Sequence, residues 1–415
     1  MSDEEKVNVS HEDEENCQDE GTFSLSLLDL PVEVFLHICS FLDAKTLVHG
    51  LGLVCKQFHE ILNDDSLWKV RINQIWPNVR YPTLPQDEED ELFWKLSCVA
   101  IERQTSLWHD EDSMEKLTLS NVHYSMVDGV LLMHNGQLCI SGARDRTLVL
   151  WRLPNDEDKC AKSMSVDLAH NGWIWDLTSI GDTIYSCSWD KTIKAWALSD
   201  AGLTHLTTYE LSLPGALLSI TSCPELSLFA TGSFCKSVVL FDSRTDSKPV
   251  GIYQAHQRAV IGLAMNSNYI ISASEDKTVV IYDHRTQRFL NKFAISDDSF
   301  PMSLCMRDDV VYVGDKGGKL HILDPKKNYE CVKTYDTAHD KGITGVYCAD
   351  GCLITSSMDK TVRILSPTDP PQIITTLNCG YGEIAGIDYL NEVLAVSGIE
   401  AVEIWRPKRN TESTL

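Results

Sequence analysis

The most regular feature of the chain is an alternation of apolar and polar positions that recurs at a nearly fixed interval. In the segment SCSWDKTIKAW, a strand of small residues is followed by a polar tight turn and by a second strand with β-branched residues at alternate positions. Seven such segments start at Ser141, Ser186, Thr231, Ser272, Val313, Thr355 and Ala395. Their starts are almost evenly spaced, and a period of roughly 40–45 residues predicts repeated four-stranded propeller blades.

The seven repeats predict one closed β-propeller over residues 113–407. One blade cannot bury both of its faces, whereas seven blades set around a channel can. The last repeat ends at Trp405 after only three strands, and MEKLTLS at 114–120 is a strand without a blade of its own. We expect these two regions to pair, because this would complete the seventh blade and remove both free sheet edges.

Two polar positions recur together with the strands. Four repeats carry a turn Asp, and a His precedes the start of each at a nearly constant spacing; these are Asp145, Asp190, Asp276 and Asp359, and His123, His170, His256 and His339. In these positions the repeats resemble WD repeats, in which a His, a Ser or Thr, the Asp and a Trp form a hydrogen-bonded tetrad. The resemblance implies two complete tetrads: His123, Ser141, Asp145 and Trp151, and His170, Ser186, Asp190 and Trp196.

Ser, His and Asp together would also suit a hydrolase triad. Their recurrence at fixed spacing in several repeats favours the structural role. Three repeats depart from the pattern. The third has Cys235 at the Asp position and no His, and the fifth has Val313 at the Ser or Thr position and Gly317 at the Asp position. The seventh has Ile399 at the Asp position. Whether these three repeats keep full tetrads stays open at this point.

A pattern with helical spacing precedes the propeller, in residues 25–72. Val34, Ile38 and Leu42 recur at helical spacing after Pro31, and further short helices follow, one of them starting at Asp43. So short a segment with so many large apolar side chains would form only a marginal domain alone. We therefore expect it to share its apolar surface with a partner; a private helical bundle packed on the propeller is the alternative.

The ordered set of apolar residues in this segment resembles an F-box, and its place before a WD propeller resembles the F-box/WD-repeat protein family. In that family the F-box binds the Skp-type adaptor of a cullin-RING ubiquitin ligase, and the propeller binds a protein substrate. The resemblance implies a substrate-recognition subunit of an SCF-type E3 ligase; the alternative is a WD scaffold that binds the adaptor without promoting degradation. Carried over by position, the adaptor contacts would be Leu30, Pro31, Val34, Ile38, Leu42 and Leu47.

The remaining segments are a linker and two tails. Residues 73–112 contain three prolines and then an acidic stretch, Asp87–Glu91, before an apolar stripe of Leu92, Leu96 and Val99, which predicts a helical linker. The N-terminal segment carries nine acidic side chains and one Lys, so residues 1–22 are expected to be a disordered acidic tail. Residues 408–415 form a short C-terminal tail.

The charge distribution excludes several classes of partner. The formal net charge is -24; residues 113–407 hold 26 basic and 35 acidic side chains (26 - 35 = -9), and the remaining -15 lies almost wholly before residue 113. Such a surface repels phosphate backbones, so we expect no nucleic acid partner. No apolar run approaches the roughly 20 residues of a spanning helix, and we expect no membrane partner.

The cysteines and the known catalytic motifs predict a binder rather than an enzyme. Fourteen cysteines are scattered without a CxxC pair, so we expect no metal or other cofactor, and free thiols in a reducing cytoplasmic or nuclear location. GDKGGK at 314–319 lacks phosphate-loop spacing, and HExxH and GxSxG motifs are absent from the sequence. The expected chemistry is therefore protein binding alone.

The resemblance to WD propellers also implies a substrate-binding face. In such propellers the residue before the turn Asp projects onto the top face; here these are Arg144, Trp189, Phe234, Glu275, Lys316, Met358 and Ile399. The loop after His170 adds Trp173 and Trp175. Large aromatic residues are unusual in turns, so we expect Trp173 and Trp189 to be exposed, while Trp175 could equally pack in the core.

We expect this face to bind an apolar or aromatic degron over blades two and three, with one acidic residue reaching Arg144. Two basic positions are too few for a strong phosphate-binding surface, which requires several arginines. The predicted substrate-binding residues are Trp173, Trp175, Trp189, Phe234, Met358 and Arg144.

Overall fold

The computed structural model describes residues 27–75, 93–110, 113–155, 160–211, 215–245, 247–307, 310–366 and 368–408. The chain divides into two compact units, Met1–Ile61 and Leu62–Leu415. The predicted acidic tail, nearly all of the predicted C-terminal tail and the expected acidic start of the linker helix lie outside the described residues.

The first unit consists of short helices built around two phenylalanines. Phe35 and Phe58 are buried, and their rings stack with centroids 4.5 Å apart. Asp43 caps the second helix as expected, because its carboxylate accepts a hydrogen bond from the Thr46 backbone N–H at 2.9 Å. The elements are η1 (Leu27–Asp29), α1 (Val32–Cys39), α2 (Ala44–His49), η2 (Leu51–Leu53) and α3 (Lys56–Leu62), which ends at the border between the units.

The second unit begins with two longer helices, α4 (Asp65–Ile75) and α5 (Phe93–His109). Trp68 on α4 is fully buried, and its indole N–H donates to the Leu62 carbonyl oxygen at 2.9 Å. Arg71 on α4 and Glu102 on α5 form an ion pair with an N···O distance of 2.6 Å. The expected linker helix is therefore present, and it packs against the helix before it.

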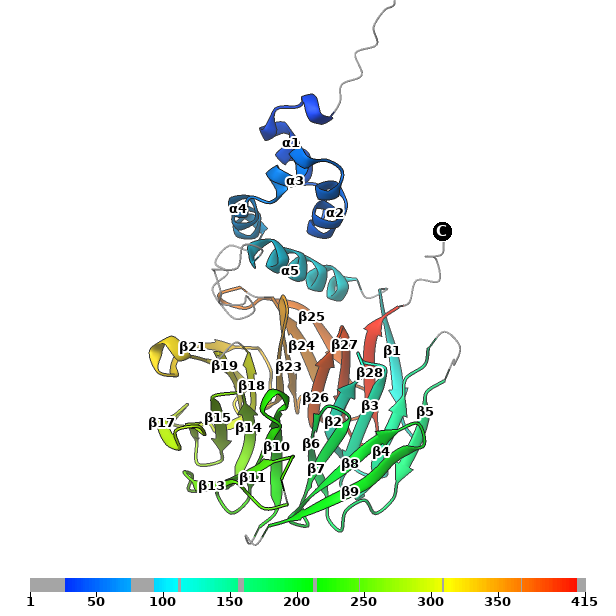
Figure 1. Cartoon of the computed structure of the whole chain (residues 1–415), viewed down its shortest axis with the longest axis vertical. Helices are drawn as coiled ribbons and strands as arrows, with labels where there is room; N and C mark the ends of the chain where they lie inside the picture. Colours follow the sequence, from blue (N-terminus) through cyan, green and yellow to red (C-terminus); the bar gives the residue numbers. More distant parts are fainter. Residues whose placement is uncertain are drawn as a thin grey trace, which may run out of the picture. The chain divides into compact units, whose positions relative to one another are not determined.

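Seven four-stranded antiparallel sheets follow and form the propeller (Figure 1). Blade one contains β2 (Val127–Met133), β3 (Leu138–Ala143), β4 (Leu148–Arg152) and β5 (Lys162–Val166), and blade two contains β6 (Ile174–Ile180), β7 (Thr183–Ser188), β8 (Thr192–Ser199) and β9 (Gly202–Glu210). Blade three contains β10 (Leu217–Cys223), η4 (Pro224–Leu226), β11 (Leu228–Ser233), β12 (Ser237–Asp242) and β13 (Gly251–Gln254). Blade four contains β14 (Val260–Met265), β15 (Tyr269–Ser274), β16 (Thr278–Asp283) and β17 (Arg288–Ala294).

The last three blades complete the circle. They contain β18 (Pro301–Arg307), β19 (Val310–Asp315), β20 (Lys319–Asp324), η5 (Pro325–Lys327) and β21 (Glu330–Asp336); β22 (Ile343–Ala349), β23 (Cys352–Ser357), β24 (Thr361–Leu365) and β25 (Ile373–Asn378); β26 (Gly386–Leu390), β27 (Val393–Ser397) and β28 (Val402–Pro407), with β1 (Met114–Leu119) as the outer strand.

Pairing between the first and last strands closes the ring. β1 runs antiparallel to β28, with Met114 opposite Pro407 and Leu119 opposite Val402, which confirms the expected completion of the seventh blade. The apolar core lies between neighbouring blades. Val130 of blade one, for example, belongs to the same buried cluster as Ala395 of blade seven. Closure therefore gives the outer faces of the first and last blades a partner surface.

The two complete tetrads implied by the resemblance are hydrogen-bonded. In blade two, His170 Nε2 lies 2.7 Å from Ser186 Oγ, and His170 Nδ1 lies 3.0 Å from Asp190 Oδ2. The indole N–H of Trp196 donates to Ser186 Oγ at 2.9 Å. The same contacts in blade one measure 2.8, 3.0 and 2.8 Å, between His123, Ser141, Asp145 and Trp151.

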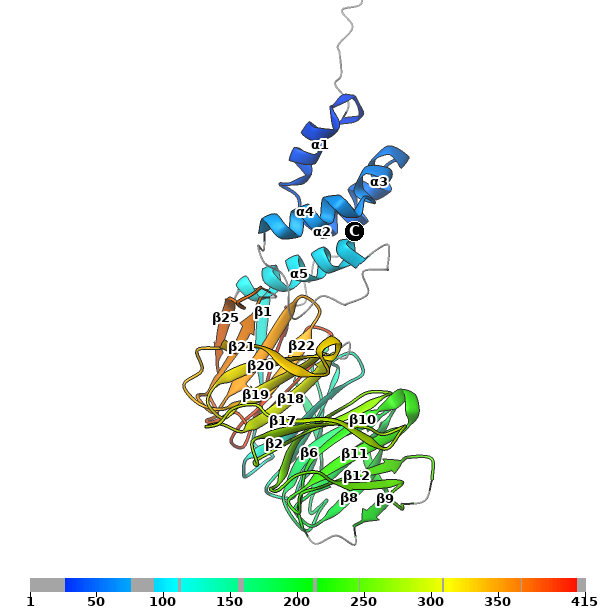
Figure 2. The ribbon, with the colours of Figure 1, turned by 90° about the vertical axis from the view of Figure 1, so that its left-hand side faces the viewer.

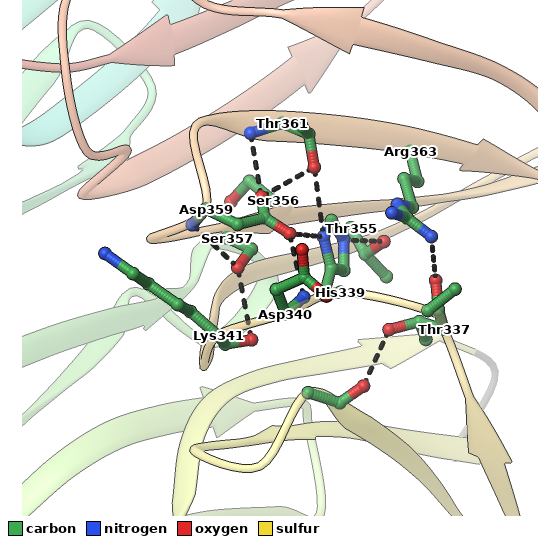
Figure 3. A network of polar contacts seen from close by, with 12 residues as sticks. Thr337, His339, Asp340, Lys341, Thr355, Ser356, Ser357, Asp359, Thr361 and Arg363 are labelled. Atoms are coloured by element: carbon green, nitrogen blue, oxygen red, sulfur yellow. Dashed lines mark hydrogen bonds and ion pairs between the residues drawn. The ribbon is translucent and has the colours of Figure 1, made fainter.

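Blade six keeps the network without a tryptophan (Figure 3). His339 Nδ1 lies 2.8 Å from Asp359 Oδ2, and its Nε2 lies 3.0 Å from Thr355 Oγ1. The hydroxyl of Thr361 donates to Asp359 Oδ1 at 2.6 Å. Leu365 occupies the position of the Trp. The tetrad therefore joins the loop before the inner strand to the turn between the two middle strands.

The three departing repeats lack this arrangement in the part of the chain described here. In blade three, the hydroxyls of Ser233 and Ser237 hydrogen-bond to each other at 2.8 Å across the turn. In blade seven, the buried indole nitrogen of Trp405 has no hydrogen-bond partner among the described residues. Blade five substitutes a different pair, in which His321 Nε2 lies 3.2 Å from Asp315 Oδ2. The signal for this pair was present in the sequence as an Asp and a His on two adjoining strands.

Replacing Asp190 with Ala tests the structural role of the tetrad. The carboxylate accepts hydrogen bonds from the Asn171 and Thr192 backbone N–H groups at 2.8 and 2.9 Å, in addition to its contact with His170. Loss of this partly buried acceptor should destabilise the propeller by about 1–3 kcal/mol and lower Tm in a thermal melt. Asp182→Ala, at a well-exposed position in the same blade, is the control and should leave Tm nearly unchanged. Equal melting curves for the two variants would contradict the structural role.

The stabilising effect of His170 should depend on pH. Burial lowers the pKa of His170, although its hydrogen bond with Asp190 opposes this shift. In the unfolded chain a His has a pKa of about 6.5. The folded His170 has a lower pKa, so it becomes protonated only at a lower pH. The contribution of neutral His170 to stability is therefore complete above about pH 6.5 and is lost as the pH falls. The Tm difference between the native chain and His170→Gln should shrink from pH 8 to pH 5; a constant or growing difference would exclude this account.

Candidate functional site

One candidate surface lies on the first unit, along α1. Pro31, Val34 and Ile38 are exposed, and Leu30 and Leu42 are half-buried, so five of the six expected adaptor contacts have accessible atoms. Leu47 is 1% exposed and belongs to the core, so it presents almost no accessible surface for the expected contact. The helical spacing that placed Leu47 in the pattern cannot tell an inward residue from an outward one.

Three further exposed apolar residues of the first unit were not among the expected adaptor contacts. Phe41, Leu53 and Val54 are 77%, 73% and 69% exposed, although each is large and apolar. Phe41 follows the last turn of α1, and its ring meets the His37 ring edge-on at 5.1 Å. Exposed apolar side chains at this density typically mark a protein interaction site. The sequence shows that these three residues are large and apolar, but the helical pattern was interpreted as packing inside the unit.

The second candidate surface is the propeller face that carries the turns between the two middle strands of each blade. In six blades, the residue before the turn position that carries Asp in four repeats donates its backbone N–H to the carbonyl oxygen of the residue just before the inner strand. In blade two, Trp189 N–H donates to the Trp173 carbonyl oxygen at 2.8 Å, and in blade five Lys316 N–H donates to Phe300 at 3.0 Å. The equivalent acceptors are Met126, Ala216, Ala259 and Gly342. This bond recurs in six of the seven blades and holds the turn and the residue before the inner strand together at the same face.

Four aromatic rings lie together on blades two and three. Trp189 is the centre of the cluster, with ring centroids 5.7 Å from Trp173, 6.1 Å from Trp175 and 6.2 Å from Phe234. Trp173, Trp189 and Phe234 are 42%, 44% and 54% exposed, which confirms the expected exposure of the two tryptophans. Trp175 is half-buried and packs against the core below them.

These rings form the rim of a cavity of about 680 Å³ that continues into the central channel. The inner strands of all seven blades contribute to its wall, and Glu275 and Phe300 complete the rim on blades four and five. Phe300 was missed from the sequence. The equivalence of Phe300 with Trp173, each one residue before an inner strand, is the signal that would have found it.

Two of the expected substrate contacts are placed differently from the expectation. Met358 is half-buried on blade six, and it is not among the residues that line the cavity. Arg144 is not among the lining residues either, and its guanidinium is paired with the lining residue Asp128, with N···O distances of 2.8 and 3.0 Å. The guanidinium carbon also lies 5.3 and 5.0 Å from the ring centroids of Trp173 and Trp175.

The Arg144 ion pair changes the electrostatics of the site. Hydrogen bonding with Asp128 raises the pKa of Arg144, while burial raises the pKa of Asp128 against the effect of Arg144. An incoming carboxylate would have to compete with Asp128 for the guanidinium. We expected an acidic substrate residue to contact a free Arg144, but the guanidinium is already paired with Asp128.

A half-buried aspartate also lines the channel. Asp176 accepts hydrogen bonds from the backbone N–H groups of Leu177 and of Ile220 in the next blade, at 2.8 and 2.9 Å. Burial nevertheless raises the pKa of Asp176 to about 7. Two further cavity-lining groups, Trp175 Nε1 and Ser219 Oγ, have no hydrogen-bond partner among the described residues. Both atoms are buried, so they lie beneath the cavity wall rather than on its surface.

On the opposite side of the propeller, α5 lies against blades six and seven (Figures 1 and 2). Gln104 on α5 accepts hydrogen bonds from Trp108 Nε1 at 3.0 Å and from the Tyr389 hydroxyl at 3.2 Å. Gly351, in the turn between β22 and β23, has φ of +83°, and a Cβ there would lie 2.7 Å from the Ala100 carbonyl oxygen. Within a blade, the turns that α5 contacts and the turn that carries Trp189 lie at opposite ends of the strands. The aromatic face is therefore left uncovered by α5.

Neither a metal site nor a membrane span emerges from the described ranges. No three His, Cys, Asp or Glu residues there are grouped so that they could hold a metal ion. No described helix is both long and apolar enough to cross a membrane.

Known proteins share both modules. An F-box-like domain matches residues 27–73, and the WD domain, G-beta repeat, matches residues 159–197, 247–283 and 329–366. The chain is 32% identical to F-box/WD repeat-containing protein 9 of Homo sapiens over 388 residues, which is 92% of this chain and 82% of that protein. The protein of the same name from Bos taurus is 32% identical over 389 residues, with the same coverage. F-box/WD repeat-containing protein mec-15 of Caenorhabditis elegans is 32% identical over 322 residues, 74% of this chain and 77% of that protein.

Proposed function

Because the chain belongs to the F-box/WD repeat protein family, we propose that it is the substrate-recognition subunit of an SCF-type ubiquitin ligase. Its F-box binds the Skp-type adaptor, and through it a cullin-RING ligase, while the aromatic face of the propeller binds a protein substrate. The chain contributes proximity rather than catalysis, by holding the substrate near the charged ubiquitin carrier. The proposed location is the cytoplasm or nucleus, where cysteines stay reduced; every cysteine in the described ranges is a free thiol.

One observation carries the proposal, which is that each module keeps a large apolar surface that faces solvent. On the F-box this surface includes Val34, Ile38 and Phe41, and on the propeller it includes Trp189 and Phe234. Interface hot spots are enriched in such aromatic anchors. Two separate apolar surfaces on one chain suit a protein that brings two partners together.

The chemistry of the aromatic rim favours an unphosphorylated substrate segment. Arg144 is ion-paired with Asp128, and the Lys316 ammonium lies 5.1 Å from the Phe300 ring centroid. Glu275 adds a negative charge to the rim between them. A phosphate would meet one ion-paired guanidinium, one ammonium group beside Phe300 and a carboxylate, whereas an apolar or aromatic side chain would meet Trp173, Trp189 and Phe234.

The adaptor surface can be tested by placing charges on α1. Val34 and Ile38 are 44% and 37% exposed, so replacing both with Asp should leave the helix folded and remove two apolar contacts. Loss of about 1.5 kcal/mol per buried side chain predicts an adaptor affinity at least about a hundredfold weaker. The measurement is titration calorimetry with the purified Skp-type adaptor.

Val250→Asp is the matched control for the adaptor experiment. Val250 is 49% exposed on the propeller, so the same substitution changes the charge without touching α1. This variant should bind the adaptor as the native chain does. Unchanged adaptor binding by the α1 variant, with both proteins folded by circular dichroism, would count against an active F-box.

The substrate surface can be tested by truncating Trp189. As the central ring of the cluster, Trp189 should act as a hot spot, and Trp189→Ala should cost about 2 kcal/mol or more of client affinity. Proximity labelling in cells should then lose a set of client proteins. Tyr124→Ala, an 80% exposed aromatic residue of blade one that lies outside the cavity lining, should retain them. Arg144→Ala should have a smaller effect than Trp189→Ala.

Two outcomes would overturn the proposed recognition. Clients that still bind after loss of both Trp173 and Trp189 cannot be anchored by the aromatic rim. Clients that are lost after phosphatase treatment would require a phosphate-reading surface instead. Clients that bind through Trp189 but are not ubiquitinated, and keep their abundance when residues 25–72 are deleted, would support the alternative of a scaffold that binds the adaptor without promoting degradation.

A further inference from the structure

Blade five contains a polar cluster that takes no part in the proposed substrate or adaptor surfaces. Asp315 and His321 are buried, with 1% and 2% exposure, and His321 Nε2 lies 3.2 Å from Asp315 Oδ2. On its other side, His321 Nδ1 lies 3.0 Å from Thr334 Oγ1 and 4.0 Å from Cys331 Sγ. Cys331 itself is exposed on the outer strand β21. A carboxylate, an imidazole and a thiol therefore follow one another from the blade interior to the surface.

A β-bulge produces this arrangement. The register between β20 and β21 shifts so that Ile322 faces Lys333 while Leu323 faces Cys331, which leaves Val332 as the extra residue. Without a bulge, residues three apart on a strand would point to opposite faces. The extra residue brings both Cys331 and Thr334 to the side of His321. Bulges of this kind re-aim side chains next to functional sites.

The combination of thiol and imidazole distinguishes blade five from the other blades that share this bulge. Blades two, four and six have a bulge at the same place, but the residue equivalent to Cys331 is His205, Phe289 or Ile373. In those blades the buried histidine comes from the loop before the inner strand, as His170 does. Blade five carries its histidine on β20 instead, where the second ring nitrogen faces the outer strand.

The polar contacts of Cys331 favour its ionised form. The sulfur lies 3.6 Å from Thr334 Oγ1, and in the thiol form it can donate to the Lys333 carbonyl oxygen at 3.5 Å. Burial opposes ionisation, but hydrogen bonds with His321 and Thr334 hold the pKa of Cys331 below its usual value. Burial also opposes protonation of His321, yet hydrogen bonds with Asp315 and Cys331 raise the pKa of His321. The remaining ionisable groups nearby are Asp324, Glu330 and Lys333, whose ammonium is 3.0 Å from Asp369.

We propose that Cys331 is a modification site: a nucleophilic thiol, activated by His321 with Asp315 as the positioning residue, that forms mixed disulfides with small-molecule disulfides such as glutathione disulfide. The Cys331 thiol gives its proton to His321 Nδ1, and the thiolate sulfur attacks one sulfur of the disulfide. A new S–S bond forms as the old one breaks. The leaving glutathione thiolate takes a proton from the His321 imidazolium, so one protein thiol is oxidised as one glutathione is reduced.

The test compares Cys331 with Cys160, the other exposed cysteine among the described thiols. The reduced full-length chain is incubated with glutathione disulfide at pH 7, and glutathione occupancy at each cysteine is followed by peptide mass spectrometry. Each unit of lowered pKa increases the thiolate fraction about tenfold and reduces intrinsic nucleophilicity about threefold, for a net gain of about three- to fourfold. Cys331 should therefore react several-fold faster than Cys160, and dithiothreitol should release the glutathione. Equal rates would overturn the proposal.

The role of His321 is tested by His321→Gln, which should slow Cys331 to the rate of Cys160 without changing Cys160. An unchanged Cys331 rate in a folded variant would also overturn the proposal. If this variant fails to fold, the alternative measurement is the rate at which iodoacetamide alkylates Cys331 and Cys160 in the native chain as a function of pH. The ratio of the Cys331 rate to the Cys160 rate should fall as the pH rises, because hydrogen bonds with His321 and Thr334 lower the pKa of Cys331 and its gain in thiolate is greatest at low pH. A ratio that does not vary with pH contradicts an activated thiol.

Discussion

Burial of both faces of every blade is the constraint on which the rest of the structure depends. A four-stranded sheet with apolar residues on two sides is stable only between two neighbours, and seven such sheets satisfy this condition only as a ring. The pairing of β1 with β28 supplies the last neighbour. The tetrads then act within single blades. In blade two, His170 and Asp190 hold the loop before the inner strand against the turn that presents Trp189.

The repeat pattern predicted the fold because strand alternation and a constant period survive even where the polar signature does not. Blades three, five and seven form although their tetrads are absent or replaced among the described residues, since strand pairing depends on the apolar positions. The site was less predictable. A sequence pattern placed Leu47 and Val34 in one set of apolar contacts, but only packing separates a 1% exposed residue from a 44% exposed one. The pairing of Arg144 with Asp128 likewise depends on the fold, because it requires the turn of a blade to meet the inner strand.

The two ends of the propeller channel differ in chemistry. On one side α5 lies against the turns of blades six and seven, and Gln104 is held between Trp108 and Tyr389. On the other side the aromatic rim opens to solvent above a wall that contains Asp128 and Asp176. The chain therefore places its own helix against part of one face and leaves the aromatic rim on the other face open. Blade five adds an independent chemical feature at the circumference, away from both openings.

The propeller ring can close only after its last strand has been synthesised. Met114 begins β1, whereas its partner strand β28 starts only at Val402, near the end of the chain. At a translation rate of about 5–20 residues per second, β1 waits roughly 15–60 s for β28 to be made. During that interval the earlier blades can form in order on the ribosome, but blade one exposes a face that only blade seven can cover. Burial of that apolar face therefore depends on the strand of the ring that is synthesised last.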